Sequence, residues 1–436
     1  MATTFIGVLL SWILLILGKT AFLWAPVILM YVGLNLWHHF VTERFILGMT
    51  WTLFEIHVPR DVEKSPMAME LIFTNAMYHA SGKGFWDIWI VGAPHFWFSL
   101  EIAGVDGSVR FYVRTPSRIR DLVETQIYAQ YPQAKVREAD DYTLAVPYDA
   151  PNKDWMVWGC EYVLKEHDAL PIRTYVDYGL DKPSDKEDLK IDPLTPTIEF
   201  LGSLHRGQQI WIQHVIRPSL KPYHGHGGHH QGWVEEAHDE MNRIMEPYSE
   251  EYFQTAAGRE TKSGPTAKRY TLPKPIEDKV EKIRGKIMKL GFDVGIRVIA
   301  VGDARYCSEF DFKNICRASR LLFRQYAAPD GNSFVRMNGT GYDTQYADPT
   351  GKGGQNIKNR ALNWYRHRVF YHPPLWHSIS YPWFISLFYK NNQPKYSVLN
   401  VEEIATIFHF PGQVSQAPSF KRVESRTAKP PANLPI

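Results

Sequence analysis

Cysteine is scarce in this 436-residue chain, which contains three: Cys160, Cys307 and Cys316. An odd number without metal-ligand spacing argues against a disulfide scaffold and favours a reducing compartment. Small buried side chains are the simplest interpretation of all three. A strong net charge is lacking too, because 49 Lys and Arg against 46 Asp and Glu leave only +3. The chain as a whole is therefore not built as a strong polyanion binder.

Recognisable catalytic motifs are also lacking. A phosphate-binding P-loop needs GxxxxGK[ST] between a strand and a helix, and this pattern occurs nowhere in the chain. The run GKGG at 351–354 resembles it only faintly. No GxSxG or HExxH pattern stands out either. We therefore expect a protein that is not an enzyme, has no cofactor and does not itself hydrolyse ATP.

Charge is nearly absent from the first forty residues. Between Phe5 and Trp37 the single charged side chain is Lys19. The run Ala21–Trp37 approaches the about 20 apolar residues that a helix needs to cross a bilayer, whereas Phe5–Gly18 is short for a full span. We expect residues 1–50 to be a membrane anchor with one or two transmembrane helices.

A cleaved signal peptide is the competing interpretation of this run. It would need a basic stretch before the apolar run and small residues before a cut site. The first four residues carry no charged side chain, and no A-x-A pattern follows Gly18. The anchor is therefore the favoured interpretation. The flanking charges barely indicate an orientation, because one Lys precedes the longer run and one Arg follows it.

Residues 51–150 alternate between strand and helix patterns. Asp106-Gly107 between two apolar runs is a strong hairpin signal. Ser65 and Pro66 suit the N-cap and the first position of a helix. The expected strands are 52–59, 94–105, 108–114 and 135–138, and the expected helices are 65–77 and 116–131. The order β-α-β-β-α-β predicts a ferredoxin-like unit.

A looser version of this order recurs in residues 151–340, with a polar insertion at 219–275. The expected strands are 160–165, 208–217, 292–301 and 333–337, and the expected helices are 192–204, 234–252, 276–290 and 310–327. Gly291 is the expected C-terminal cap of the helix before it. The sequence therefore predicts an α+β protein with an N-terminal transmembrane segment and two ferredoxin-like units, the second with an insertion.

The C-terminal region divides into two parts. Residues 341–398 are rich in Gly, Asn, Pro and aromatic residues and are expected to be irregular. Residues 399–436 are expected to form a short helix and a flexible tail, with Asn400 as N-cap and Glu403 completing a capping box. The tail carries the candidate partner-binding side chains Lys421, Arg422, Arg426 and Lys429.

Two stretches carry candidate site residues. The candidate metal ligands are His224, His226, His229 and His230, the only metal-like spacing in the chain. Imidazoles suit zinc, copper or nickel, but the surrounding glycines make the loop flexible and no cysteine accompanies them. The candidate membrane or nucleic-acid surface consists of Lys358, Arg360, Trp364, Arg366 and Arg368. Basic residues with aromatic neighbours suit phosphate backbones, an anionic membrane surface or an ordinary solvated patch.

Several phrases together resemble a family of bacterial proteins. They are EIHVPRDVEKSPMAME (55–70), PHFWFSLEI (94–102), FYVRTP (111–116), ETQIYAQYP (124–132), GQQIWIQHVIRP (207–218) and VLNVEEIATIFHFP (398–411). The family is a membrane-anchored, uncharacterised domain found N-terminal to, or encoded beside, TraG/TraD-like type IV secretion and conjugation ATPases. In longer relatives a stretch like PPANLPI leads into the motor domain, whereas this sequence stops there at Ile436.

The resemblance implies a non-catalytic scaffold or docking module of a secretion or conjugation apparatus, with ATP hydrolysis in a separate polypeptide. It carries over no catalytic residues. With the scarce cysteines, it leads us to expect a cell-membrane protein whose large domain faces the cytoplasm. A nucleic-acid-binding module using 352–368 and a metal-dependent protein using 224–230 are the alternative functions, and a homo-oligomer stays open.

Overall fold

The computed structural model describes residues 2–59, 64–80, 82–149, 152–181, 191–219, 232–253, 266–270, 272–340, 352–372 and 394–411. They belong to two compact units. We call Met1–Met49 with Ser81–Pro94 the anchor unit, and Thr50–Ala80 with His95–Ile436 the sheet unit.

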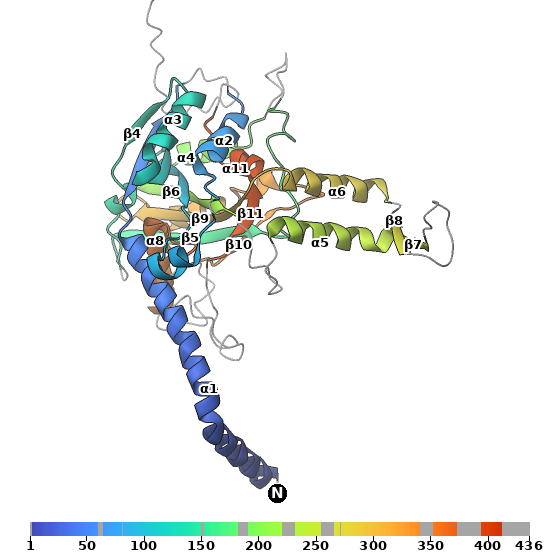
Figure 1. The fold of residues 1–436 in the computed structure, drawn as a ribbon. Helices are drawn as coiled ribbons and strands as arrows, with labels where there is room; N and C mark the ends of the chain where they lie inside the picture. Colours follow the sequence, from blue (N-terminus) through green and yellow to red (C-terminus); the bar gives the residue numbers. More distant parts are fainter. Residues whose placement is uncertain are drawn as a thin grey trace, which may run out of the picture. The chain divides into compact units, whose positions relative to one another are not determined.

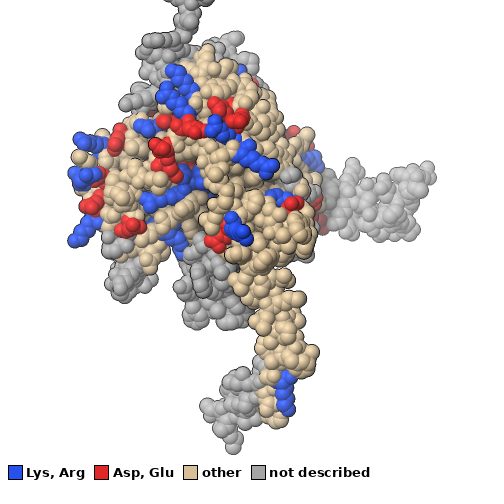
Figure 2. All heavy atoms as spheres, turned by 60° about the vertical axis from the view of Figure 1, so that its left-hand side comes forward, with Lys and Arg blue, Asp and Glu red and all other residues tan. Residues whose placement is uncertain are grey.

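The anchor unit is dominated by one helix, α1 (Ala2–Leu47), which contains Pro26. Its part Gly18–Leu47 is long and apolar enough to cross a membrane, and no residue in its most apolar stretch is buried within the protein. In the view of Figure 2, α1 is almost free of charged side chains. The two apolar runs of the sequence are thus continuous in a single helix. The unit also contains the π-helical turn η2 (Asp87–Val91).

The sheet unit is built on one nine-stranded antiparallel sheet in the order β10-β5-β9-β6-β2-β3-β1-β4, with β11 paired to β9 (Figure 1). The strands are β1 (Trp51–His57), β2 (Phe98–Val105), β3 (Ser108–Pro116), β4 (Lys135–Glu138), β5 (Trp155–Leu164), β6 (Gln208–Pro218), β9 (Gly291–Asp303), β10 (Phe334–Met337) and β11 (Ser397–Asn400). A separate ribbon pairs β7 (Ser249–Phe253) with β8 (Thr266–Tyr270).

The two halves of the sheet have the same strand order. The first runs β4-β1-β3-β2 and the second runs β10-β5-β9-β6, each in the chain order fourth, first, third, second. They meet where β2 pairs with β6, so that Ile102 lies opposite Ile212. The hairpin between β2 and β3 turns at Asp106 and Gly107, which both have positive φ as a type I′ turn requires.

Helices cover both faces of the sheet, and two more project away from it side by side (Figure 1). They are α2 (Met67–Ile72) with its π-helical continuation η1 (Phe73–Met77), α3 (Arg120–Gln130) after η3 (Ser117–Ile119), α4 (Thr195–Gly202), α5 (Trp233–Met245), α6 (Lys274–Ile287), α7 (Glu309–Ser319), α8 (Lys352–His367) and α11 (Val401–Ile407). Short 3-10 turns are η4 (Tyr142–Ala145), η6 (Glu246–Tyr248) and η7 (Arg324–Tyr326). Helices α5 and α6 run side by side in Figure 1 and share a small apolar cluster.

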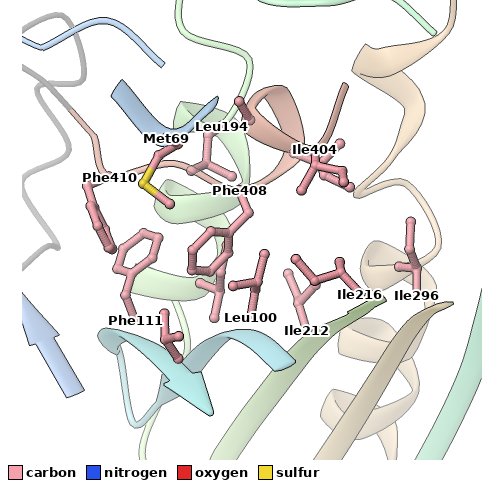
Figure 3. Close-up of a cluster of buried hydrophobic side chains, with 14 of the residues drawn as sticks. Met69, Leu100, Phe111, Leu194, Ile212, Ile216, Ile296, Ile404, Phe408 and Phe410 are labelled. Carbon is pink, nitrogen blue, oxygen red and sulfur yellow. The ribbon is translucent and has the colours of Figure 1, made fainter. Parts of the chain in front are cut away.

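The main core lies on the face of the sheet covered by α2, α3, α4, α7 and α11. Figure 3 shows how it is assembled: Leu100, Phe111 and Ile212 rise from three strands toward Ile404 of α11 and Phe408, which follows it. Helix α11 is held there by its capping box, because Asn400 and Glu403 exchange side-chain and backbone hydrogen bonds. Every second residue of the strands faces this core, as a period of two requires.

The opposite face carries a smaller apolar cluster and many polar side chains. Tyr112 and Trp211 of the strands pack there against Leu362 and Tyr365 of α8. Because both faces are covered, the central strands are buried along nearly their whole length, and β9 is buried at all 13 positions. The polar side chains on this face are therefore enclosed within the protein and must satisfy one another.

The mixed helix and sheet composition agrees with the predicted class, and the strands lie close to their expected positions. Ser65 Oγ accepts from the Met67 N–H at 3.4 Å and Pro66 has helical φ and ψ, as expected for the N-cap and the first position of α2. Two local expectations are wrong. Gly291 is the first residue of β9 rather than a cap, and a Cβ there would lie 2.6 Å from the Trp233 ring. Within the stretch expected to be irregular, Lys352–His367 form α8, whose apolar side packs on the sheet.

Candidate functional site: an aromatic segment on the anchor and a buried charged network

The anchor unit contains an aromatic segment, residues 82–94 (GKGFWDIWIVGAP). Its helical turn is closed locally: the Asp87 carboxylate accepts from the Gly84 N–H at 3.0 Å, and the Ala93 N–H donates to the Asp87 carbonyl at 2.9 Å. Lys83 joins the two ends, because its Nζ donates to the carbonyls of Ala93 and Pro94 at 2.6 and 2.5 Å. These contacts close the segment into a loop.

This aromatic segment is fastened to the C-terminal part of α1. Trp37 Nε1 donates to the Trp89 carbonyl at 2.8 Å, and the Trp89 ring meets the His38 ring edge-on with centroids 5.3 Å apart. Gly92 lies against the helix backbone at φ +69°, and a Cβ there would be 2.4 Å from the Val41 carbonyl carbon. Only glycine fits this left-handed turn without displacing the segment from the helix.

The outward side of the aromatic segment is apolar and uncovered within the described residues. Phe85 is 73% exposed and Trp86 is 66% exposed, and Ile88, Ile90 and Val91 are exposed as well. Trp and Phe presented in this way beside an apolar helix are typical of side chains that lie at a membrane–water interface. A contiguous apolar patch of this kind indicates a binding surface.

The second feature is a charged network buried on the α8 side of the sheet. Its centre is Glu101 of β2, which is fully buried. Arg368, just after α8, donates to both Glu101 carboxylate oxygens at 2.9 and 3.1 Å, and it also pairs with Asp141. Further donors to Glu101 are Ser99 Oγ at 2.6 Å, Tyr142 Oη at 2.8 Å and Gln213 Nε2 at 3.2 Å.

Gln213 of β6 connects Glu101 to a second ion pair. Arg297 Nη1 donates to Gln213 Oε1 at 3.5 Å, and Arg297 Nη2 donates to Glu161 at 2.7 Å. Asn338 donates to the other oxygen of Glu161 at 2.7 Å. The network therefore crosses the β2–β6 junction and connects both halves of the sheet.

Electrostatics keep the Glu101–Arg368 pair ionised. Burial alone would raise the pKa of Glu101, but the charge and hydrogen bonds of Arg368, with those of Ser99 and Tyr142, outweigh it and hold the pKa below its usual value. Burial likewise opposes the charge on Arg368, yet Glu101 and Asp141 hold its pKa well above the ordinary value. A carboxylate held ionised in this way suits a structural lock rather than a general acid.

The three cysteines are not part of the charged network. All three are buried, and burial raises the pKa of the Cys160 and Cys316 thiols to about 12. The expectation that they fill buried positions is confirmed. Within the described part of the chain, no cluster of three His, Cys, Asp or Glu side chains has the arrangement of a metal site.

The residues of the candidate surface within 352–368 differ in burial. Arg368 is 1% exposed and Trp364 is 7% exposed, so the prediction that they belong to a membrane or nucleic-acid surface is wrong. The reason is that the apolar side of α8 packs on the sheet, and Arg368, directly after α8, forms an ion pair with the buried Glu101. Arg366 donates to the Val146 carbonyl, and burial lowers the pKa of Lys358. The guanidinium of Arg360 lies 5.2 Å from the Trp364 ring centroid.

The other predicted sites lie outside the described residues. These are the histidines His224, His226, His229 and His230, and the tail residues Lys421, Arg422, Arg426 and Lys429. They remain predictions.

The buried charged network and the aromatic segment were not predicted, because their sequence signals are weak. Glu101 and Gln213 occupy the polar positions of alternating strands, which are usually solvent-facing. The run FWDIWIV has no helical or strand periodicity that would mark it as an element.

Comparison with known proteins adds no assignment. No protein-family model matches the chain, and a search of curated proteins finds no similar sequence.

Proposed function

We propose that this protein is a membrane-anchored, non-catalytic scaffold that docks a separate TraG/TraD-like ATPase in a type IV secretion- or conjugation-like apparatus. The observation that carries the proposal is α1, whose most apolar stretch within Gly18–Leu47 has no residue buried within the described protein. A helix that is apolar all round and uncovered needs a membrane or an equivalent apolar partner. The identity of the apparatus is proposed from the resemblance of the chain to the secretion-associated family.

The sheet unit suits a rigid docking body. Its buried charges pair with one another, as Glu101 does with Arg368 and Glu161 does with Arg297. We infer that each half of the sheet is a ferredoxin-like unit with the split β-α-β arrangement. Support comes from the shared strand order and the antiparallel pairing of β1 with β3 and of β5 with β9.

The proposal places the sheet unit in the cytoplasm, where the ATPase would reach it. Its scarce, buried cysteines suit a reducing compartment. In this scheme the docking region includes the basic tail with Lys421, Arg422, Arg426 and Lys429, which follows the well-packed helix α11.

Co-purification tests the docking role. The full chain and a chain ending at Pro411 would each be tagged, extracted from membranes in mild detergent and probed for a co-purifying TraG/TraD-like ATPase. We expect both to insert and fold, and the shortened chain to recover less ATPase. Equal recovery would remove the tail from the interface, and no ATPase with either chain would contradict the scaffold.

Orientation is tested separately on intact cells. A cysteine introduced at the exposed Lys153 should resist an impermeant thiol reagent until the membrane is opened. Ready labelling of intact cells would place the sheet unit outside.

A further inference from the structure

We propose that the aromatic segment, residues 82–94, is a second membrane-embedded element that lies in the lipid headgroup and acyl-chain boundary beside α1. The inference rests on the proposed role of α1 as a membrane span. It adds a lipid-binding surface that the apolar N-terminal run does not itself contain. The side chains assigned to lipid are Phe85, Trp86, Ile88, Ile90 and Val91.

Depth along α1 is the first argument. Between Lys19 and Glu43 the helix has 23 residues, Thr20–Thr42, without Lys, Arg, Asp or Glu. At about 1.5 Å per residue they extend roughly 35 Å, slightly more than the about 30 Å hydrocarbon core of a bilayer. The contacts of the aromatic segment fall on Trp37–Val41, the last turn and a half of this run. The segment is therefore fastened at the depth of one membrane interface.

Composition is the second argument. Trp and Phe rings are favoured at the interface, where an apolar body meets lipid and a polar edge meets water. The two charges of the segment are both engaged: Lys83 on the carbonyls of Ala93 and Pro94, and Asp87 on the Gly84 N–H. The helical turn, Lys83 and Asp87 satisfy backbone groups of the segment internally, which a lipid environment demands. The exposed surface that remains is largely apolar.

A fluorescent probe at the interface tests the inference. Single cysteines would replace Phe85 or Trp86 in the full chain, and a matched cysteine would replace Met288 of the sheet unit, which is 86% exposed. The native cysteines are buried, so the unsubstituted chain serves as the labelling blank. Each variant would carry the environment-sensitive dye NBD in vesicles of phosphatidylcholine and phosphatidylglycerol.

We expect NBD at positions 85 and 86 to emit at shorter wavelength than at position 288. Lipids spin-labelled near the headgroup should quench it more strongly than lipids labelled at the chain end. If protein that floats with the vesicles emits at the same wavelength from positions 85 and 86 as from position 288, the inference is overturned, but the membrane anchor is not. Shielding that occurs only in native membranes would assign the surface to a protein partner instead. Protein that fails to float would overturn the membrane anchor itself, and the inference with it.

Discussion

Buried titratable side chains of the sheet unit fall into paired and unpaired kinds. Lys286 and Glu403 are both fully buried and lie 3.0 Å apart, and His409 lies 3.1 Å from Asp192. His214 differs, because its ring nitrogens form no hydrogen bond of ordinary geometry within the described residues, and the Leu100 backbone offsets its burial only in part. Its ring lies among Phe323, Phe408 and aliphatic side chains. An unpaired buried base opposes protonation, whereas a paired one favours it.

His214 predicts an acid-sensitive fold. Burial lowers its pKa from 6.5 to about 4. Since the unfolded chain binds this proton more readily, the stability that neutral His214 contributes is complete above pH 6.5 and is lost as pH falls toward 4. The shift corresponds to about 3 kcal/mol at most. We expect His214→Leu to flatten the fall in unfolding free energy over this range, measured by denaturant titration in detergent micelles.

His409 provides a control of opposite sign. Burial lowers its pKa, but the charge and hydrogen bond of Asp192, with backbone carbonyls, outweigh burial and raise it above 6.5. Its contribution is therefore complete below pH 6.5 and is lost as pH rises through the folded-state pKa. His409→Gln should cost most on the acid side. Parallel pH profiles for the wild type and His214→Leu would contradict the assignment.

The Arg368–Glu101 pair predicts strong coupling. Arg368→Met leaves the fully buried Glu101 without its cation, a change that typically costs about 3–5 kcal/mol. Adding Glu101→Gln should recover part of the loss, because no buried charge then remains at position 101. A matched control is Arg305→Met, which removes an ion pair to Asp303 from an exposed side chain and should change little. Additive losses in the double variant would disprove the coupling.

At the scale of elements, local sequence patterns predicted some strands and turns, but not the elements that tertiary packing stabilises. The alternation in Gln208–Pro218 and the Asp106-Gly107 turn indicated β6 and the first hairpin, because period and turn chemistry are local properties. Helix α8 was missed because its first turns contain Gly353, Gly354 and Asn356, which have weak helix propensity, and because packing of Leu362 and Tyr365 on the sheet stabilises it. The aromatic segment was missed because its contacts lie about fifty residues away on α1.

Gly92 predicts how the aromatic segment is held to α1. Gly92 and Gly179 have nearly the same φ, +69° and +71°, but only Gly92 has a neighbour within 4 Å. Gly92→Ala and Gly179→Ala should thus share the backbone strain, about 1–2 kcal/mol, while only the first clashes with Val41. We expect Gly92→Ala to release the segment and speed tryptic cleavage after Lys83, followed by mass spectrometry. Equal cleavage in both variants would show that the contact with α1 is dispensable.

At the scale of the whole molecule, the two halves of the sheet unit share their packing. Strands β2 and β6 pair from Phe98–Ile216 to Val105–Gln209. The first half also uses C-terminal pieces: α11 packs near α2, and Arg368 binds Glu101 and Asp141. The positions of most strands along the chain followed from the sequence, but the union of the two halves in one sheet did not, because β2 carries no signal for its partner across the junction.

This union predicts that neither half folds alone. A chain with a specific protease site between Asp149 and Asn152 should, after cleavage, elute as one particle in detergent. It should unfold in a single transition reported equally by tryptophan fluorescence and circular dichroism. Residues 50–149 expressed alone should lack stable structure, because β2 then has an open edge and Glu101 has lost Arg368. If the cleaved halves instead separated with native spectra, the β2–β6 junction would be a contact between independent domains. The proposed scaffold requires a sheet unit that stays in one piece, so this outcome bears directly on that proposal.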